Sequence, residues 1–209
     1  MKAETFSYNS IDELASNCYL LIDSKRKCVI IDPSVDYDGI VNFIINNKLT
    51  PVAILLTHGH YDHIKGVKRL VKRFSLPIYI HSLEVETLSD PFLNRSEELN
   101  IVLDIPVHTI EDGDRLKLLS DDDIIVIHTP YHTIGSVCYY LKKDGLLFSG
   151  DTVFKMTIGR ADLPTSTPRN KEESLGKIKS LPKETVIYPG HGRSTILSNE
   201  LAFNRFLMR

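Results

Sequence analysis

Cysteine is scarce in this sequence, and its distribution excludes the usual structural uses of thiols. The three cysteines, Cys18, Cys28 and Cys138, lie far apart, and each falls within an apolar, strand-like segment. A disulfide framework or a thiolate metal site needs an even number of cysteines or closely spaced pairs. We therefore interpret all three residues as buried free thiols.

Long apolar runs and an excess of one charge are also missing. No apolar stretch approaches the roughly 20 residues that span a bilayer, and residues 1–8 contain no apolar signal-peptide core. The chain has 25 Lys and Arg against 27 Asp and Glu, a formal net charge of −2. This balance does not favour nucleic acid or an anionic membrane as a partner. We expect a cytoplasmic protein that binds neither.

Low-complexity segments and linkers are absent as well, so we expect a single domain over residues 1–209. Apolar, strand-like segments alternate along the chain with segments of helical periodicity. The strand-like segments are 18–22, 28–31, 52–56, 78–80, 124–128, 136–141, 146–148 and 186–188. The helix-like segments are 37–47, 64–74, 83–88, 171–181 and 198–207. The pattern predicts two β-rich halves covered by helices, a layered α/β (α+β) arrangement.

Two Asp-Gly pairs mark expected hairpin turns. Residues 143–145 read Lys-Asp-Gly and separate two strand-like segments, and residues 111–114 read Glu-Asp-Gly-Asp. Asp-Gly favours tight turns between paired strands. We expect a hairpin at each place, the one at 111–114 joining two edge strands.

Residues 57–63 hold the most informative motif, Thr-His-Gly-His-Tyr-Asp-His. Imidazole suits zinc and iron, and a carboxylate adds negative charge and a proton acceptor. The motif follows the strand-like segment 52–56 and precedes the helix-like segment 64–74. It therefore lies on a strand-to-helix loop at the carboxyl end of a strand, where open α/β sheets usually place their sites. We predict a metal site here.

Three more ligand-type residues share this context. His132, Asp151 and His191 each follow an apolar strand-like segment. Neighbouring strands present such ends on a common rim, so these side chains can converge with the first motif. The remaining histidines, His81 and His108 near strand ends and His128 within a strand, are interpreted as structural or as orienting groups near the site.

Seven ligand-type residues are too many for one tetrahedral zinc ion and suit two metals. The predicted ligands are His58, His60, Asp62, His63, His132, Asp151 and His191. We assign His58, His60 and His132 to one metal, and Asp62, His63 and His191 to the second. Asp151 is the expected bridge, because a carboxylate has two oxygens. We expect zinc, with Fe²⁺ or Mn²⁺ as alternatives, and a hydroxide nucleophile formed from water held between the two ions.

At this point the sequence strongly resembles the metallo-β-lactamase superfamily of hydrolases. The ligand set matches in order, and further matching segments are Asn17–Tyr19, Ile31–Pro33, Gly135–Val137, Ser149–Thr152 and Tyr188–Gly192. Residues 158–163 and the tail pattern Glu200-x-x-x-Asn204-x-Phe206-Leu207 resemble the short glyoxalase II-like (hydroxyacylglutathione hydrolase-like) branch. The resemblance implies a four-layer αβ/βα sandwich with the metal site at the rim of the two sheets. It also implies hydrolysis of S-lactoylglutathione or another small-molecule thioester.

Three departures from the branch pattern affect the expected substrate. Tyr131 stands where the family usually has Gly and is expected to narrow or line the pocket, and Ala161 replaces the usual Thr. The glutathione-holding helical domain of full-length glyoxalase II is not expected beyond Arg209. Asp62 is the expected residue to orient the nucleophile and accept its proton. Arg160 is expected either to bind an anionic part of the substrate or to pair with Asp162.

The main alternative is an iron-dependent persulfide dioxygenase, which resembles the same branch and uses one iron. Its ligands here would be His58, His132 and Asp151. Both kinds of enzyme keep all seven residues, so ligand identity does not separate them. A lactonase is a further alternative, and a secreted β-lactamase fits less well because we identify no signal peptide.

Overall fold

The computed structural model describes residues 1–6, 16–34 and 37–208, and its strands form two large sheets. The first has the order β1 (Lys2–Phe6), β2 (Cys18–Ile22), β3 (Lys27–Ile31), β4 (Thr50–Leu55), β5 (Ile78–His81) and β6 (His108–Ile110). The second has the order β14 (Thr195–Ile196), β13 (Val186–Pro189), β10 (Leu146–Gly150), β9 (Val137–Leu141), β8 (Ile124–His128) and β7 (Arg115–Leu116). A small third sheet pairs β11 (Val153–Phe154) with β12 (Thr157–Ile158).

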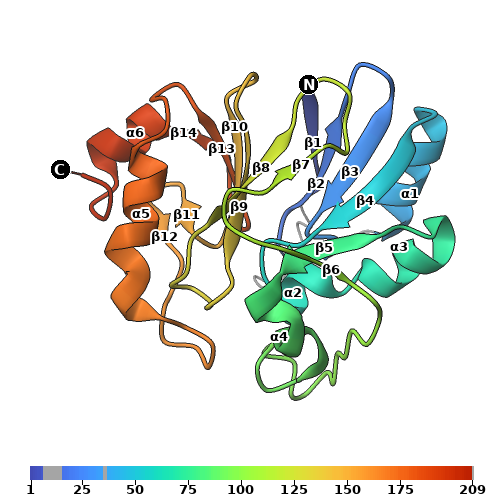
Figure 1. Ribbon diagram of the computed structural model, residues 1–209, viewed down its shortest axis with the longest axis horizontal. Helices are drawn as coiled ribbons and strands as arrows, with labels where there is room; N and C mark the ends of the chain where they lie inside the picture. The colour runs from blue at the N-terminus through green and yellow to red at the C-terminus, as the bar shows by residue number, and fades with distance from the viewer. Residues whose placement is uncertain (7–15, 35–36, 209) are drawn as a thin grey trace.

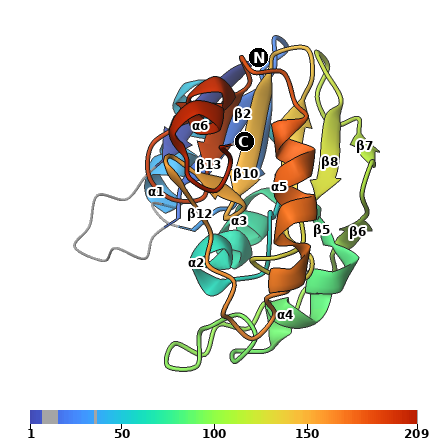
Figure 2. The same ribbon diagram turned by 90° about the vertical axis from the view of Figure 1, so that its left-hand side faces the viewer.

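Helices cover the outer faces of both large sheets. The helical elements are α1 (Tyr37–Asn46), α2 (Tyr61–Ile64), α3 (Val67–Phe74), η1 (Ser82–Glu84), α4 (Val85–Ser89), η2 (Pro168–Asn170), α5 (Lys171–Lys179) and α6 (Leu197–Phe203). Figure 1 shows α1 and α3 outside the first sheet, and α5 and α6 outside the second. Figure 2, seen from the side of α5 and α6, shows these helices in front of the second sheet. The predicted four-layer αβ/βα sandwich is confirmed.

Alternating side chains of each strand serve two different cores. In β2, Cys18 and Leu20 pack in the cluster under α1 and α3, whereas Tyr19 and Leu21 pack between the two sheets. Such double burial explains the nearly continuous apolar sequence of this strand, since neither face meets water. A third cluster lies beneath α5 and α6 and includes Leu175 and Leu197. The three cysteines are buried and none of them is in a disulfide, as predicted.

Each predicted strand segment overlaps an observed strand, and each predicted helix overlaps an observed helix. The predicted helix 64–74 is interrupted, however. The short helix α2 already begins at Tyr61, and α3 starts only at Val67. Between them, the Gly66 backbone N–H donates to the carbonyl oxygen of Pro33 at 2.7 Å. A Cβ atom at position 66 would lie 2.6 Å from that oxygen, so this close approach requires glycine.

Only one of the two predicted hairpins is present. The turn at 143–145 joins β9 to β10, which pair antiparallel, as predicted. At 111–114 the predicted turn between two edge strands is confirmed, but the predicted hairpin pairing is wrong: the turn joins β6, at the edge of the first sheet, to β7, at the edge of the second. An Asp-Gly turn defines the local bend, but pairing of the flanking strands depends on which sheet each one joins. Within the described part of the chain, no helix is long and apolar enough to cross a bilayer.

Candidate metal centre

The predicted ligands come from four strand ends on one rim of the sandwich. His58 and His60 follow β4, and His132 follows β8. Asp151 follows β10 and His191 follows β13. Strands β8 and β10 are both antiparallel to β9, and β13 is parallel to β10, so all three end on the same side. The remaining two ligands, Asp62 and His63, lie on α2 rather than in the loop where the sequence placed them.

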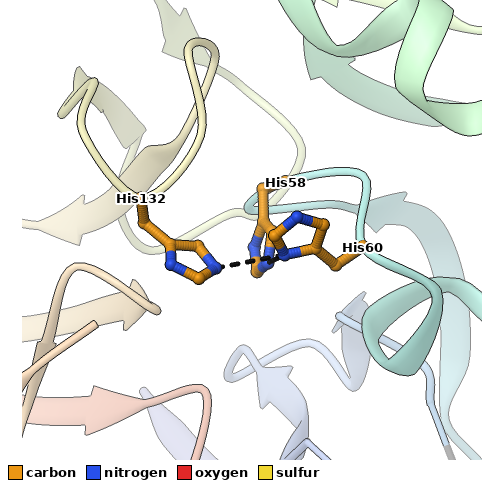
Figure 3. Close-up of side chains that lie close together, drawn as sticks. All are labelled: His58, His60 and His132. Atoms are coloured by element: carbon orange, nitrogen blue, oxygen red, sulfur yellow. Dashed lines mark hydrogen bonds between the residues drawn. The ribbon is translucent and has the colours of Figure 1, made fainter. Parts of the chain in front are cut away.

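Three imidazoles form one cluster, here called the three-histidine cluster: His58, His60 and His132. His60 Nδ1 lies 3.1 Å from His58 Nε2 and 3.1 Å from His132 Nε2. Figure 3 shows the three rings turned toward a common point, with His132 approaching from a different segment. A single ring N–H can be donated to only one of these nitrogens, whereas one cation can accept a lone pair from all three.

A second cluster, here called the Asp62 cluster, contains Asp62, His63 and His191. Asp62 Oδ2 lies 3.1 Å from His191 Nε2 and 3.6 Å from His63 Nε2. All three side chains thus present a ligand atom to the same space. The predicted partition of six ligands between two metals corresponds to these two clusters.

Asp151 lies between the two clusters. Its Oδ1 is 3.4 Å from His63 Nε2, and its Oδ2 is 3.5 Å from His132 Nε2 and 3.6 Å from His191 Nε2. One carboxylate therefore faces ligands of both clusters, as expected of a bridging residue. Among described residues, Asp151 Oδ1 and His63 Nε2 are buried without a hydrogen-bond partner. When His63 is neutral with its hydrogen on Nδ1, both atoms are acceptors aimed at one space, which is costly unless a cation is shared between them, so this donor set fits metal ions.

Hydrogen bonds on the far side of the rings orient them. His63 Nδ1 lies 2.9 Å from Asp32 Oδ2, and His132 Nδ1 lies 2.7 Å from the carbonyl oxygen of Arg160. Both oxygens can only accept, so each Nδ1 carries the hydrogen and leaves the Nε2 lone pair facing the cluster. His58 Nδ1 is 3.1 Å from the Thr57 hydroxyl.

Burial and neighbouring charge give the two clusters opposite protonation preferences. Burial, together with the other histidines, lowers the pKa of His58 well below its usual value and that of His60 to about 3. Burial alone would also lower the pKa of His63, but the carboxylates of Asp62, Asp32 and Asp151 outweigh it and raise that pKa well above its usual value. His58 and His60 are thus neutral ligands near pH 7, whereas His63 must lose a proton to bind metal.

The carboxylates remain ionised. Burial would raise the pKa of Asp151, but the charges of His63, His132 and His191 reverse the effect and lower it well below its usual value. For Asp62, burial also raises the pKa, and His63 and His191 lower it to a net value below normal. Both groups can therefore serve as anionic ligands.

Residues 11–191 match the profile of the metallo-beta-lactamase superfamily. The chain belongs to that superfamily. The probable metallo-hydrolase YqgX of Bacillus subtilis is 35% identical over 200 residues, covering 94% of this chain and 94% of the relative. The solved structure of the BLEG-1 B3 metallo-beta-lactamase has a TM-score of 0.91 and 36% identity and covers 100% of both chains. That of TTHA1623 in a di-iron-bound form has a TM-score of 0.85 and 33% identity and covers 99% of this chain and 100% of that one.

The chain is therefore a metallo-hydrolase of the metallo-beta-lactamase superfamily. Its cluster of His and Asp side chains opens into a pocket of about 370 Å³. The pocket is lined by His60, Tyr61, Asp62, Arg95, His132, Asp151, Phe154, Arg160, Leu163 and His191. Arg95 and Phe154 could not be found from the sequence, because each belongs to a loop or short strand without a motif of its own. Leu163 lies in the matched segment 158–163, which was a signal for it.

The two residues predicted to bind substrate differ in position. Arg160 lines the pocket, but its guanidinium is held by both carboxylate oxygens of Asp162, at 2.6 and 2.7 Å. Tyr131 is fully buried in the cluster beneath α5, and its hydroxyl donates to the carbonyl oxygen of Thr152. The structure places Tyr131 behind the site, away from the pocket where the sequence suggested it.

Two buried carboxylates near the site had no role in the sequence analysis. Asp32 accepts hydrogen bonds from the backbone N–H and hydroxyl of Thr57 as well as from His63. Glu84 accepts from the backbone N–H groups of Gly59 and Gly135. Asp32 lies in the matched segment Ile31–Pro33, which was a signal for it; Glu84 lies in a helix-like segment and had none.

The histidines interpreted as structural lie outside the two clusters. The His81 and His128 rings stack with centroids 4.0 Å apart, and His81 Nε2 lies 3.3 Å from a carboxylate oxygen of Glu111. His108 stacks on Tyr79 with centroids 5.1 Å apart.

Proposed function

We propose that this protein is a dinuclear metallohydrolase that cleaves small thioesters, of the glyoxalase II type. The carrying observation is the position of Asp151 between two three-residue clusters, a donor arrangement suited to a pair of metal ions. Metal ions bound there would act as Lewis acids on a carbonyl oxygen and make water a better nucleophile. Side chains of the protein would orient the nucleophile, accept its proton and bind the substrate.

Asp62 is the proposed proton acceptor. It lines the pocket, is ionised because its pKa is lowered, and has its Oδ2 held 3.1 Å from His191 Nε2. A carboxylate fixed at the pocket wall can orient an attacking water molecule and accept its proton as the carbonyl is attacked. Since His191 holds this oxygen, the orientation of Asp62 does not depend on the substrate.

The pocket supports a small acyl substrate. A volume of about 370 Å³ lies at the lower end of the range for ligand sites, roughly 300–1,000 Å³. Phe154 and Leu163 offer apolar contact, and Arg95 and Arg160 offer positive charge near the anionic metal ligands. Because Asp162 already neutralises Arg160, we expect weak binding of an anionic substrate group and hence a high KM rather than a low kcat.

The tail pattern that suggested the glyoxalase II-like branch has a structural role here. Glu200 accepts from Asn204 Nδ2 at 2.9 Å and from the Met156 backbone N–H at 2.8 Å, and Asn204 Nδ2 also donates to the carbonyl oxygen of Thr157. These bonds attach α6 to the β11–β12 hairpin. The tail therefore supports the pocket wall that carries Phe154. We expect substrate selectivity to depend on the residues that line the pocket.

Two other activities must be separated from thioester hydrolysis. The TTHA1623 structure holds two irons, which favours testing iron beside zinc, and an iron form could support persulfide oxidation. The 36% identical BLEG-1 structure is described as a B3 metallo-beta-lactamase, which favours testing a β-lactam amide. Zinc has no redox chemistry, so oxygen consumption by the zinc form is not expected.

The experiment reconstitutes metal-free protein separately with Zn²⁺ and with Fe²⁺. Each form is assayed with S-lactoylglutathione, a neutral thioester, a β-lactam and, for oxygen uptake, glutathione persulfide. We expect thioester hydrolysis with a high KM in at least the zinc form. Oxygen uptake by the iron form, with no thioester cleavage by either form, would replace the hydrolase proposal with the dioxygenase. Cleavage of the β-lactam alone would replace the thioester with an amide substrate.

A further inference from the structure

Glu84 connects two loops that carry metal-ligand residues. Its Oε2 accepts from the backbone N–H of Gly59 at 2.7 Å, and its Oε1 accepts from that of Gly135 at 2.8 Å. Gly59 stands between His58 and His60, and Gly135 lies three residues after His132. The two loops follow strands of different sheets, β4 and β8. One fully buried side chain thus joins the two sheets at the site.

The surrounding space is shaped for this side chain. A Cβ atom at Gly135 would lie 2.6 Å from Glu84 Cγ. A Cβ atom at Gly59 would lie 2.7 Å from Thr87 Cγ2 and 3.1 Å from Glu84 Oε2. Neither glycine has a positive φ, so conformation does not explain their presence. Glycine is needed at both places because the two backbones approach Glu84 and its helix too closely for a side chain.

Burial raises the pKa of Glu84 above its usual value, although its hydrogen bonds with Thr133 and with the backbone N–H groups of Gly59 and Gly135 lower it. Burying a carboxylate is costly, and an amide or an apolar residue could fill the space at lower cost. Two N–H groups held at one carboxylate fix the separation of their loops. That separation sets the contact of His132 Nε2 with His60 Nδ1, at 3.1 Å (Figure 3).

We propose that Glu84 is a positioning residue for metal binding: it clamps the His58–His60 loop to the His132 loop so that the three-histidine cluster is preformed. Glu84 belongs to neither ligand cluster and is not among the residues that line the pocket. The inference rests on the metal-binding part of the proposed function and is independent of the substrate. Metal sites tolerate ligand displacements of only about 0.2 Å, so small changes in loop separation should weaken binding.

The test is Glu84→Gln in a His191→Ala background, where the three-histidine cluster is the main remaining site. The Gln amide can accept from one glycine N–H but presents its own N–H₂ to the other, so one loop is released. Zn²⁺ affinity is measured by competition with a chromophoric chelator. Residues that orient metal ligands typically contribute 10–100-fold to metal affinity, and we expect a loss of that size.

Asp23→Asn is the matched control. Asp23 is also a buried carboxylate that accepts hydrogen bonds from backbone N–H groups, those of Lys25, Lys27 and Ser120. It lies at the end of β2 remote from the metal centre, so its variant should lose thermal stability without losing Zn²⁺ affinity. If Glu84→Gln lowers Tm as the control does and leaves the affinity within twofold of the parent, Glu84 is merely structural and the proposal is overturned.

Two further measurements apply if Glu84→Gln does not fold. Glu84→Asp keeps the charge but is one methylene shorter, so it can reach only one glycine, and it should show the same selective loss. Amide hydrogen exchange in the unmodified metal-free protein tests the clamp directly. Slow exchange at both Gly59 and Gly135 supports it, and fast exchange at either one overturns it.

Discussion

Lowering the pH should release metal from the Asp62 cluster before the three-histidine cluster. Metal binds only unprotonated imidazole, so protons compete wherever the pKa of the metal-free side chain lies above the working pH. The pKa of His63 is raised well above its usual value. Burial would lower the pKa of His191, but its hydrogen bond with Asp62 and the charges of Asp151 and Asp62 together raise it. Those of His58 and His60 are lowered, the latter to about 3.

The size of the effect follows from the number of displaced protons. Below the pKa of His63, each pH unit costs tenfold in apparent affinity, about 1.4 kcal/mol, for one displaced proton, and about a hundredfold if His191 must lose one too. Over about two pH units below neutrality, the Asp62 cluster should lose roughly 10²–10⁴ in affinity. His58 and His60 stay unprotonated throughout this range. Asp62 and Asp151 stay ionised, because their pKa values are lowered.

The assay is dialysis of loaded protein against metal buffers of stepped pH, followed by elemental analysis. His191→Ala protein, which keeps the three-histidine cluster, serves as the control, and circular dichroism at each pH excludes unfolding. We expect the metal content to fall from two per chain to one, and then to level off. Parallel loss of both metals with one pH slope, or a control that empties at the same pH as the wild type, would refute the assignment of protons to the two clusters.

Three substitutions test individual side chains. Asp151→Ala should reduce metal content at both clusters, whereas His191→Ala should empty mainly the Asp62 cluster, as read by elemental analysis; unchanged loading in Asp151→Ala would remove it as the bridge. Asp62→Asn should lower thioester turnover by roughly 10²–10⁴-fold while the fold survives, and full turnover with normal metal content would exclude it as the base. Asp32→Asn should weaken metal binding by about 10–100-fold, because the amide N–H₂ would face the hydrogen-bond donor of either His63 or Thr57. Asp23→Asn should leave metal binding unchanged. Asp23 is also a buried acceptor of backbone N–H groups, but it is remote from the site.

The sequence by itself determined the fold class and the local placement of the candidate ligands. The alternation of strand-like and helix-like segments predicted a layered α/β arrangement, and the resemblance to the superfamily implied the four-layer order. The structure gives the physical reason for apolar strands such as Cys18–Ile22, which are covered on both faces. His58, His60, His132, Asp151 and His191 could be found because each follows such a strand. The carboxyl ends of strands running in one direction share a rim, so a pattern within each segment was enough.

Other features depended on contacts between distant segments, which leave no local pattern. The break between α2 and α3 arises because Gly66 packs on the Pro33 carbonyl, and the turn at 111–114 crosses from one sheet to the other. Tyr131 was expected to line the pocket from its place beside His132, but its side chain turns into the core beneath α5. The sequence position of Tyr131, next to a ligand residue, indicates where its backbone lies. The direction of its side chain depends on packing with residues far away in the sequence.

Glu84 and the pairing of Arg160 show the same limit within the site. Glu84 lies in an ordinary helix-like segment, and only the folded chain brings it to glycines 25 residues before it and 51 residues after it. The sequence left open whether Arg160 binds substrate or Asp162, and the tertiary structure pairs it with Asp162. The spacing of apolar residues follows from the geometry of a single strand or helix, so it can be read from the sequence. Hydrogen bonds between loops follow from how the two sheets pack, and only the complete fold decides them.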